Sequence, residues 1–357
     1  MAENSRQRPA RKLAHLQGVC QLPDGPGDPG FRDVFLLHNC LPELDYSQID
    51  LSSSWCGRKL ASPLVINAIT GGAAATKRLN AALARAAARF GMGMAVGSQT
   101  AAVEDETLAE TFQVVRQEYP EGFIMANVSA TAPVQTALKA VQMLRADALQ
   151  VHLNVPQELA MAEGERSFVG TLENIKAIQA GVPVPVIVKE VGFGIAGREA
   201  RRLVEIGIKA LDVAGKGGTN FLAVEAWRRG EELAPALLNW GLPTVVSLLD
   251  VLQATAGQVQ VMASGGVRSG LDAVKALSLG ADMVGMAGPL VRMLMESEEL
   301  LQAELERLHE EMRTAMLMCG AANLTELRER VNVIILGETK DWLQARGISV
   351  RPFACRV

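Results

Sequence analysis

From residue 63 onwards, short apolar runs alternate with segments whose apolar residues recur at helical spacing. The runs are rich in β-branched residues and predict buried strands, whereas the spaced segments predict amphipathic helices. The eight predicted strands span residues 63–69, 92–97, 123–127, 148–154, 184–191, 210–214, 259–263 and 283–287. The helices between them are predicted at residues 75–90, 107–117, 133–145, 171–180, 197–206, 243–256 and 271–279. Eight β/α units in order predict an α/β fold, a closed (β/α)8 barrel, in preference to an open doubly wound sheet.

Two extensions flank the predicted barrel, and no linker divides the chain into independent domains. We therefore predict one structural unit with an N-terminal arm and cap at residues 1–62, the barrel at 63–296 and a C-terminal helical extension at 297–357. Residues 34–44 are predicted to contribute a strand to the cap, and residues 297–317 a charged amphipathic helix. The basic residues 1–15 are typical of a solvated tail, and the alternative is an arm that folds over an anionic ligand.

Composition narrows the classes of partner. The chain has 357 residues, 49% of them hydrophobic, which suffices for one large core. Its net charge of −4 argues against a nucleic-acid or membrane-surface binder. No apolar run reaches transmembrane length, and the N-terminus has no signal-peptide core. The five cysteines are scattered and form no CxxC pair, so we expect no disulfides, no cysteine metal site and a cytoplasmic location.

The stretch at residues 259–290, VQVMASGGVRSGLDAVKALSLGADMVGMAGPL, places a glycine turn after each of the last two strands. Gly265 and Gly266 precede one helix, and Gly288 precedes the next. Bare backbone N–H groups at helix N-termini bind phosphate, and the loops after strands seven and eight are the usual phosphate site of such barrels. The two interpretations of this stretch are a phosphate site and a pair of ordinary glycine turns.

Polar residues gather at the carboxyl ends of six predicted strands, where barrel enzymes carry their chemistry. In chain order they are Thr70, then Ser98, Gln99 and Thr100, then Asn127, then His152 and Asn154, then Lys189 and Glu190, and finally Lys216 and Thr219. Any one of them can be a capping group, and capping is the simpler role for Ser98 or Asn127 alone. Six strand ends that carry such groups together favour an active site.

Lys189 ends the strand sequence VPVIVK, so we expect its ammonium group to point into the mouth of the barrel. A lysine in that position must meet an anion or lose its proton, because burial of an unpaired charge is costly. A phosphate, or the N1–C2=O edge of a reduced flavin, would satisfy it. The alternative is a salt bridge to Glu190 or to another carboxylate of the barrel.

The sequence HLNVPQE at residues 152–158 groups further polar residues. His152 and Asn154 alternate along the strand and therefore face the same side. Glu158 has no partner acid, and a single carboxylate is a poor metal site made of protein alone. Mg²⁺, however, commonly takes one or two carboxylates together with ligand phosphates and water. Glu158 is therefore interpreted as a Mg²⁺ ligand shared with a diphosphate, or else as an acidic residue of a surface loop.

With these residues in view, the chain closely resembles the type 2 isopentenyl-diphosphate isomerases, flavoenzymes that interconvert isopentenyl and dimethylallyl diphosphate. The resemblance runs from about residue 11 to the C-terminal tail. It rests on RKLAH near the start, NAITGG at 67–72, GSQ at 97–99, HLNVPQE at 152–158, VKEVGFG at 188–194, DVAGKGGT at 212–219 and ASGGVRSGLD at 263–272. HLNVPQE together with RK near the N-terminus is specific, whereas the glycine turns are common to many FMN barrels.

The resemblance implies FMN, Mg²⁺, NADPH or NADH to keep the flavin reduced, and a homo-oligomer, a tetramer or octamer. It implies FMN binding by Ile69, Thr70, Ser98, Asn127, Lys189, Thr219, Gly265, Gly266, Arg268, Ala287 and Gly288. It implies a substrate site formed by Arg11, Lys12, His15, Ser98, Gln99, Asn154 and Gln157, with Glu158 on Mg²⁺. Its catalytic residues would be Gln157, His152 and Lys189. Thr100, Ala214 and Phe221 depart from the family, in which arginine, serine and an indole are common there.

The implied reaction moves a double bond by adding a proton at one carbon and removing one from another, with positive charge developing at a tertiary carbon. It involves no net oxidation, so the flavin would act in its electron-rich reduced form, and Lys189 beside N1 would stabilise the anionic state. The absence of an evident acid–base carboxylate pair at the strand ends favours this hypothesis.

Two other classes of function stay open. One is an FMN-dependent barrel oxidoreductase, either a 2-hydroxy-acid oxidase or an enzyme similar to IMP dehydrogenase. The latter needs a nucleophilic cysteine after strand six, and GKGGTNFLAVE contains none. The other class is a barrel that serves only as a ligand-binding or structural protein.

Overall fold

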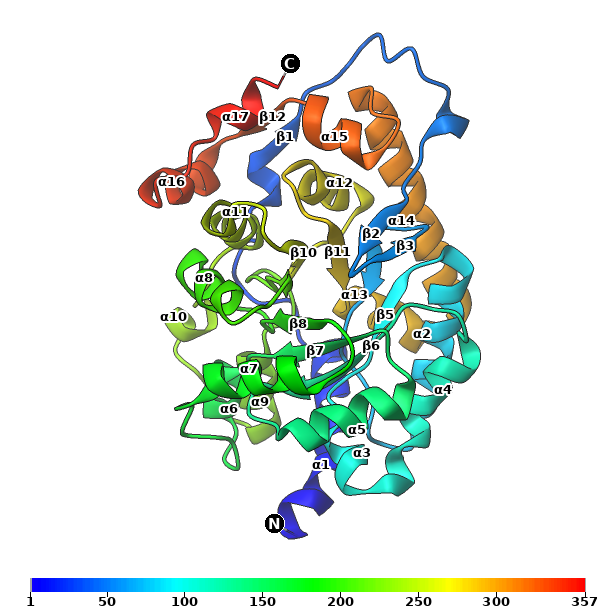
Figure 1. Ribbon diagram of the computed structural model, residues 1–357, viewed down its shortest axis with the longest axis vertical. Helices are drawn as coiled ribbons and strands as arrows, with labels where there is room; N and C mark the ends of the chain where they lie inside the picture. The colour runs from blue at the N-terminus through cyan, green and yellow to red at the C-terminus, as the bar shows by residue number, and fades with distance from the viewer. Residues whose placement is uncertain (1, 357) are drawn as a thin grey trace.

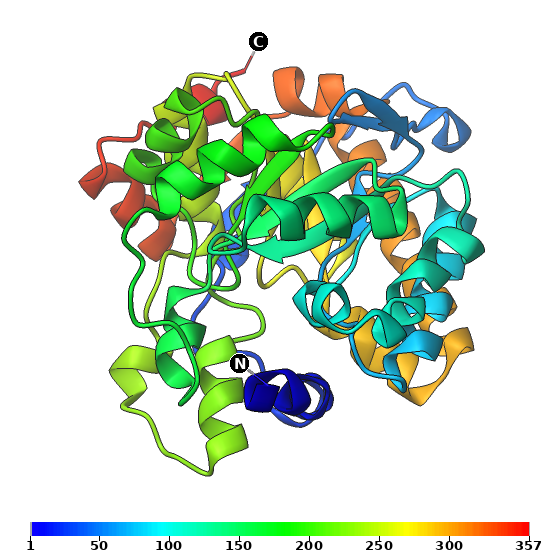
Figure 2. The same ribbon diagram turned by 60° about the horizontal axis from the view of Figure 1, so that its bottom comes forward.

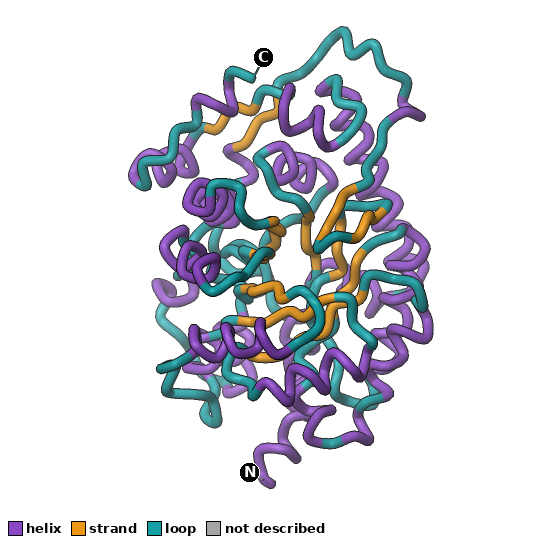
Figure 3. Tube along the Cα trace, viewed as in Figure 1, coloured by secondary structure: helices purple, strands orange, loops and turns teal. Residues whose placement is uncertain are grey.

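The computed structural model describes residues 2–356, and residues 2–11 by their backbone alone. Its strands β4–β11 form a closed parallel barrel in which β11 pairs with β4. They are β4 (Leu64–Ile66), β5 (Gly93–Ala95), β6 (Ile124–Ser129), β7 (Ala148–His152), β8 (Val186–Lys189), β9 (Ala210–Asp212), β10 (Gln260–Ser264) and β11 (Met283–Met286). The predicted (β/α)8 barrel is confirmed, and Figure 3 shows its strands in orange. Each predicted range contains one of these strands, except that β6 and β10 run slightly past the predicted ends.

Helices surround the barrel as the periodicity predicts (Figure 1). The predicted ones are α2 (Thr76–Phe90), α4 (Glu110–Glu118), α5 (Val134–Leu144), α7 (Thr171–Gly181), α8 (Gly197–Glu205), α11 (Thr244–Thr255) and α12 (Gly270–Ser278). The loops after the strands carry further helices that the periodicity did not predict: α3 (Thr100–Glu104), α6 (Val155–Ala160), α9 (Phe221–Arg229) and α10 (Pro235–Leu238). The helix α13 (Gly288–Glu296) begins directly after β11.

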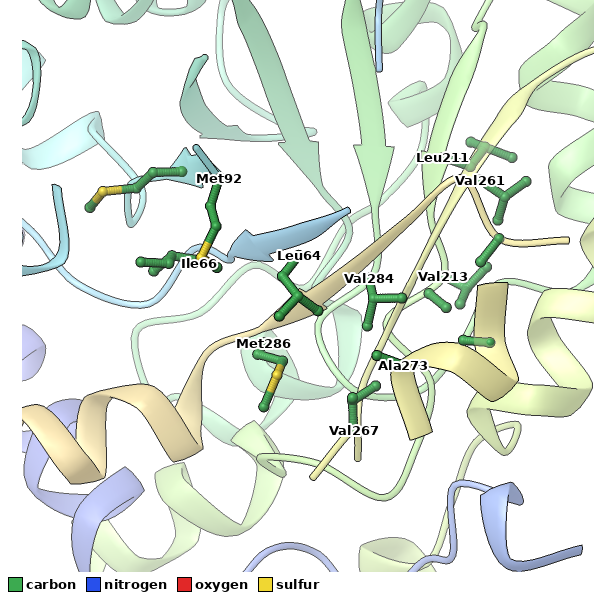
Figure 4. Close-up of a cluster of buried hydrophobic side chains, with 14 of the residues drawn as sticks. Leu64, Ile66, Met92, Leu211, Val213, Val261, Val267, Ala273, Val284 and Met286 are labelled. Carbon is green, nitrogen blue, oxygen red and sulfur yellow. The ribbon is translucent and has the colours of Figure 1, made fainter. Parts of the chain in front are cut away.

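The hydrophobic core has two parts because barrel strands bury both faces. The larger part lies between the strands and the helices, and Figure 4 shows some of its members, among them Leu211, Val261 and Val284. The smaller part fills the amino-terminal end of the barrel around the fully buried Trp55. This indole belongs to a hairpin of β2 (Ser53–Trp55) and β3 (Arg58–Leu60), which closes that end of the barrel.

The predicted strand within residues 34–44 is present as one strand of a two-stranded sheet. The strand β1 (Val34–Leu36) pairs antiparallel with β12 (Val333–Ile335) of the C-terminal extension. The predicted helix at residues 297–317 is confirmed as α14 (Glu298–Cys319), and α15 (Leu324–Arg330), α16 (Gly337–Ala345) and α17 (Arg351–Ala354) follow. None of the helices in the described part of the chain is long and apolar enough to cross a bilayer.

The N-terminal segment forms the helix α1 (Ala2–Gln21) instead of a solvated tail. It lies beside α9 and α13, and Figure 2 shows it end-on in dark blue next to the α6–α9 region. Among its described side chains, His15 and Val19 are buried. The segment therefore packs against the protein, and its alternative interpretation, an arm that folds over an anionic ligand, stays a prediction.

Candidate functional site

A cavity of about 490 Å³ opens at the carboxyl end of the barrel strands. Its wall combines strand ends, the loops that follow them and the helix α1. Most of the residues that the sequence places in the site line it: Lys12, His15, Ile69, Ser98, Asn127, His152, Asn154, Gln157, Glu158, Lys189, Thr219, Gly265, Gly266, Arg268, Ala287 and Gly288. Thr100, Ala214 and Phe221, the departures from the family pattern, line it as well.

Two predicted residues are placed differently, and a third lies partly outside the described residues. Gln99 is fully buried beside the cavity, and its side chain donates to the Ala140 carbonyl and accepts the Asn127 backbone N–H, both at 3.0 Å. In this conformation both ends of the Gln99 amide are bound to the protein, so the side chain does not make the predicted substrate contact. Thr70 is buried behind the wall and its hydroxyl has no partner among the described residues. Arg11 lies on α1, but its side chain falls outside the described residues.

The glycine turns meet at one edge of the cavity. A Cβ atom on Gly265 would lie 2.0 Å from the Gly215 carbonyl oxygen, and one on Gly218 would lie 2.8 Å from the Gly266 nitrogen. Both Gly265 and Gly266 have positive φ, so only glycine fits without strain. Within the described residues, the backbone N–H groups of Gly265 and Gly266 make no hydrogen bond to the protein. The helix α13 also begins here, so the edge offers bare amides and a helix N-terminus to an anion.

Arg268 adds a positive charge to this edge. Its guanidinium donates to the carboxylate of Asp24 and, at 3.3 Å, to the Gly217 carbonyl. Asp24 also accepts from Arg292 at 3.2 Å, so two arginines share one carboxylate from the segment after α1. Two guanidinium groups therefore lie near the glycine edge, and that of Arg268, which lines the cavity, could pair with a phosphate group.

Lys189 is buried at the end of β8, as the sequence predicts. Its ammonium group donates to the backbone carbonyl of Glu190 at 2.5 Å. The carboxylate of Glu190 turns away and accepts the backbone N–H groups of residues 191–193 at 2.6–2.9 Å. The alternative of a salt bridge between these two neighbours is therefore not what the structure contains. Burial raises the pKa of Glu190 to about 7, although the three amides and Lys189 counteract that effect.

His152 ends β7, where its Nδ1 lies 2.7 Å from the Oδ1 atom of Asn127. Burial lowers the pKa of His152 to about 3, and the nearby charges of Lys189 and Lys12 contribute to the shift. The imidazole is consequently neutral at pH 7.

Glu225, a fully buried carboxylate on α9, was not among the residues predicted from the sequence. Its Oε1 atom lies 2.5 Å from Nε2 of His15 and 3.2 Å from Nε2 of Gln157, and its Oε2 atom accepts from Arg228 at 2.8 Å. Burial raises the pKa of Glu225, but His15, Arg228 and Gln157 outweigh it and bring the value to about 2. Glu225 thus joins α1, α6 and α9 around two of the predicted site residues.

Glu158 lies on α6 at the mouth of the cavity. One of its oxygens accepts from the Asn154 amide at 2.8 Å and the other accepts the Glu165 backbone N–H at 2.9 Å. These bonds orient the carboxylate. In the part of the chain that the structure describes, no group of three or more His, Cys, Asp or Glu side chains could hold a metal ion. A cation at Glu158 would therefore need oxygen ligands from a bound molecule and from water.

Comparison with known proteins first defines the class. The family model for FMN-dependent dehydrogenases matches residues 28–160 and 123–333. A mandelate oxidase structure with a C4a-OH-FMN adduct shares the fold, with a TM-score of 0.64 at 21% identity over 90% of this chain and 99% of that one. Another, with (S)-mandelic acid, gives a TM-score of 0.63. The chain therefore matches the FMN-dependent dehydrogenase family over most of its length, and it shares the barrel fold of these flavoenzymes.

The relatives of known name are more specific. The isopentenyl-diphosphate delta-isomerase of Moorella thermoacetica is 46% identical over 95% of this chain and 97% of its own length. That of Geobacillus is 44% identical over 98% of this chain and 99% of its own length. That of Archaeoglobus fulgidus is 39% identical over 94% and 99%. The chain belongs to the isopentenyl-diphosphate delta-isomerase family and is an enzyme.

Proposed function

We propose that this enzyme interconverts isopentenyl diphosphate and dimethylallyl diphosphate by an allylic proton shift, with reduced FMN and Mg²⁺. NADPH or NADH would serve only to reduce the flavin. The observation that carries the proposal is the composition of one cavity. It combines a glycine edge with open amides and the guanidinium of Arg268, the oriented carboxylate of Glu158, and three polar groups that could hold a proton or stabilise charge, namely His152, Gln157 and Lys189.

The residues at the glycine edge fit the phosphate of FMN. Gly265, Gly266 and Gly288 leave their amides open to an anion, and Arg268 lies beside them. Ile69, Ser98, Asn127, Thr219 and Ala287 line the same cavity and would contact the rest of the cofactor, with Thr70 directly behind them. When bound, reduced FMN would supply an electron-rich ring that stabilises positive charge and a ring nitrogen that can carry a proton.

A second group of cavity residues fits the substrate diphosphate. Lys12 and His15 reach it from α1, and Arg11 lies one residue earlier on the same helix. Glu158, held by Asn154, would bind Mg²⁺ together with diphosphate oxygens. Gln157 is fixed by Glu225, so its amide would approach the reacting carbon atoms from a defined direction. Lys189 would stabilise negative charge on the cofactor ring.

The decisive experiment is an anaerobic incubation of the protein with isopentenyl diphosphate, FMN, NADPH and Mg²⁺, in which product and nicotinamide are measured separately. We expect dimethylallyl diphosphate to accumulate in large excess over the NADPH oxidised. Consumption of NADPH in step with product would instead indicate an oxidoreductase. Rapid turnover with the flavin held oxidised would refute the role given to its reduced form. Colourless protein that gains no stability from FMN would indicate a binding or structural barrel.

Lys189 provides a test at the level of one residue. Lys189→Met should slow isomerisation roughly 100-fold, because a preorganised charge at the cofactor is removed without a change in side-chain length. Lys176→Met, at an exposed position on α7, is the matched control and should leave the rate unchanged. Equal rates in the two variants would exclude Lys189 from the reaction.

A further inference from the structure

From the wall of the cavity into the barrel, five buried polar side chains form one continuous chain of hydrogen bonds. Asn67 donates to Asp212 at 2.6 Å, and Gln150 donates to Asn67 at 3.0 Å. Asn127 donates to Gln150 at 3.3 Å, and its own oxygen lies 2.7 Å from Nδ1 of His152. The five residues come from or directly follow β4, β6, β7 and β9, and Asp212 and Gln150 are completely buried.

The direction of this chain is fixed at its far end. Asp212 accepts from the Ser264 hydroxyl at 2.6 Å and from the Ala214 backbone N–H at 3.2 Å with one oxygen, and from Asn67 with the other. Both oxygens therefore act as acceptors. The oxygen of Asn67 is anchored separately, because it accepts the Ala68 backbone N–H at 2.9 Å. The Asn67 amide thus has one orientation only, with its NH₂ group toward Asp212.

The orientation of Asn67 determines the next two amides. Its oxygen is the acceptor for Gln150, so the Gln150 oxygen must face Asn127. The NH₂ group of Asn127 points at that oxygen, which leaves the Asn127 oxygen facing His152. An amide oxygen carries no hydrogen and can only accept. The proton in the last bond of the chain must therefore belong to Nδ1 of His152.

The other ring nitrogen of His152 faces a different environment. His152 lines the cavity, and no described residue makes a hydrogen bond to Nε2. The low pKa of the ring, caused by burial and by the charges of Lys189 and Lys12, keeps it neutral at pH 7. A neutral ring with its proton on Nδ1 has a lone pair on Nε2.

We propose that Gln150 is a positioning residue that, through Asn127, holds His152 in the Nδ1–H form, so that Nε2 offers a hydrogen-bond acceptor to the cavity. The ligand atom that meets Nε2 is then an N–H or O–H donor. His152 consequently does not serve as a positive contact for a diphosphate, and Lys12 with its neighbours on α1 supplies that charge. The identity of the donor rests on the proposed function, whereas the form of the ring depends on the protein alone.

The form of the ring can be read in the full-length protein before substrate is added. The chain has four histidines, so selective ¹⁵N labelling and a two-bond ¹H–¹⁵N correlation spectrum give few signals, and His152→Gln identifies the relevant one. We expect a protonated Nδ1 and an unprotonated Nε2 at pH 7. A protonated Nε2, whether in the other neutral form or in the imidazolium, overturns the proposal without recourse to any variant. If the protein gives the expected spectrum but has no isomerase activity, only the proposed function is refuted.

Variants test the part played by Gln150. Gln150→Met keeps the length of the side chain and removes both hydrogen-bonding groups, so Asn127 becomes free to turn and the Nε2–H form should appear. Asn127→Asp in the same background should restore the single Nδ1–H form, because a carboxylate can only accept. Ser264→Ala removes one bond at the far end and should leave the spectrum unchanged. A single Nδ1–H form in Gln150→Met would show that Gln150 does not position the ring.

Discussion

Replacement of Glu225 by glutamine should weaken the attachment of α1 and α6 to α9. The pKa of this carboxyl group falls from the ordinary value of 4.5 to about 2 in the folded protein. A shift of that size corresponds to about 3 kcal/mol of stabilisation at pH 7, because each pKa unit is worth roughly 1.4 kcal/mol. A glutamine at this position can still accept the hydrogen bond from Gln157, but it lacks the negative charge that pairs with His15 and Arg228. We therefore treat about 3 kcal/mol as the upper limit of the loss.

The pH dependence gives this prediction its sharpest form. Because the folded-state pKa of Glu225 is depressed, its contribution is complete above pH 4.5 and disappears as the pH falls toward 2. Urea unfolding of the wild type and of Glu225→Gln should differ most at pH 7 and progressively less below pH 4.5. Glu110→Gln, which breaks an exposed ion pair with Lys77, is the matched control and should hardly change stability. A difference that stays constant down to pH 3, or that is absent at pH 7, would refute the reasoning.

Three further variants test the proposed roles of the cavity residues. Arg268→Gln should raise the dissociation constant for FMN roughly 10-fold or more, as measured by quenching of flavin fluorescence, because a charged donor at the glycine edge is lost; an unchanged constant would remove Arg268 from the site. Glu158→Gln should raise the Mg²⁺ concentration needed for half-maximal activity while leaving FMN affinity intact, and an equal requirement would exclude it as a ligand. Lys12→Ala should raise KM for the diphosphate about 10-fold, and unaltered kinetics would leave α1 with a structural role alone.

Much of the barrel could be predicted because its signal is local. Each β/α unit carries its own apolar run and its own helical spacing, so the eight strands lie at the predicted positions. The helices α6 and α9 were missed because they are short and lie in loops that carry the site. Their residues are governed by contacts with distant parts of the chain, which no periodicity records.

The direction of a side chain could be predicted where a strand end alone decides it, and Lys189 and His152 both line the cavity. It was predicted poorly where neighbours alternate. Ser98 and Thr100 line the cavity, whereas Gln99 between them points the other way, to the carbonyl of α5. Glu225 could not be predicted at all, because its partner His15 lies 210 residues away in the sequence.

The interior of the barrel shows why stability and chemistry can occupy one fold without conflict. Its amino-terminal half is apolar around Trp55, where the burial of apolar side chains stabilises the fold and requires no hydrogen-bond partner. Its carboxyl half holds Asn67, Gln150 and Asp212, whose burial would be costly if their polar groups were unpaired. Each of these groups is paired with the next, so the cost is offset by a network that also has a direction. The donor-to-acceptor order of these hydrogen bonds matters at the carboxyl end of the barrel, because it would determine whether Nε2 of His152 faces a ligand as an acceptor.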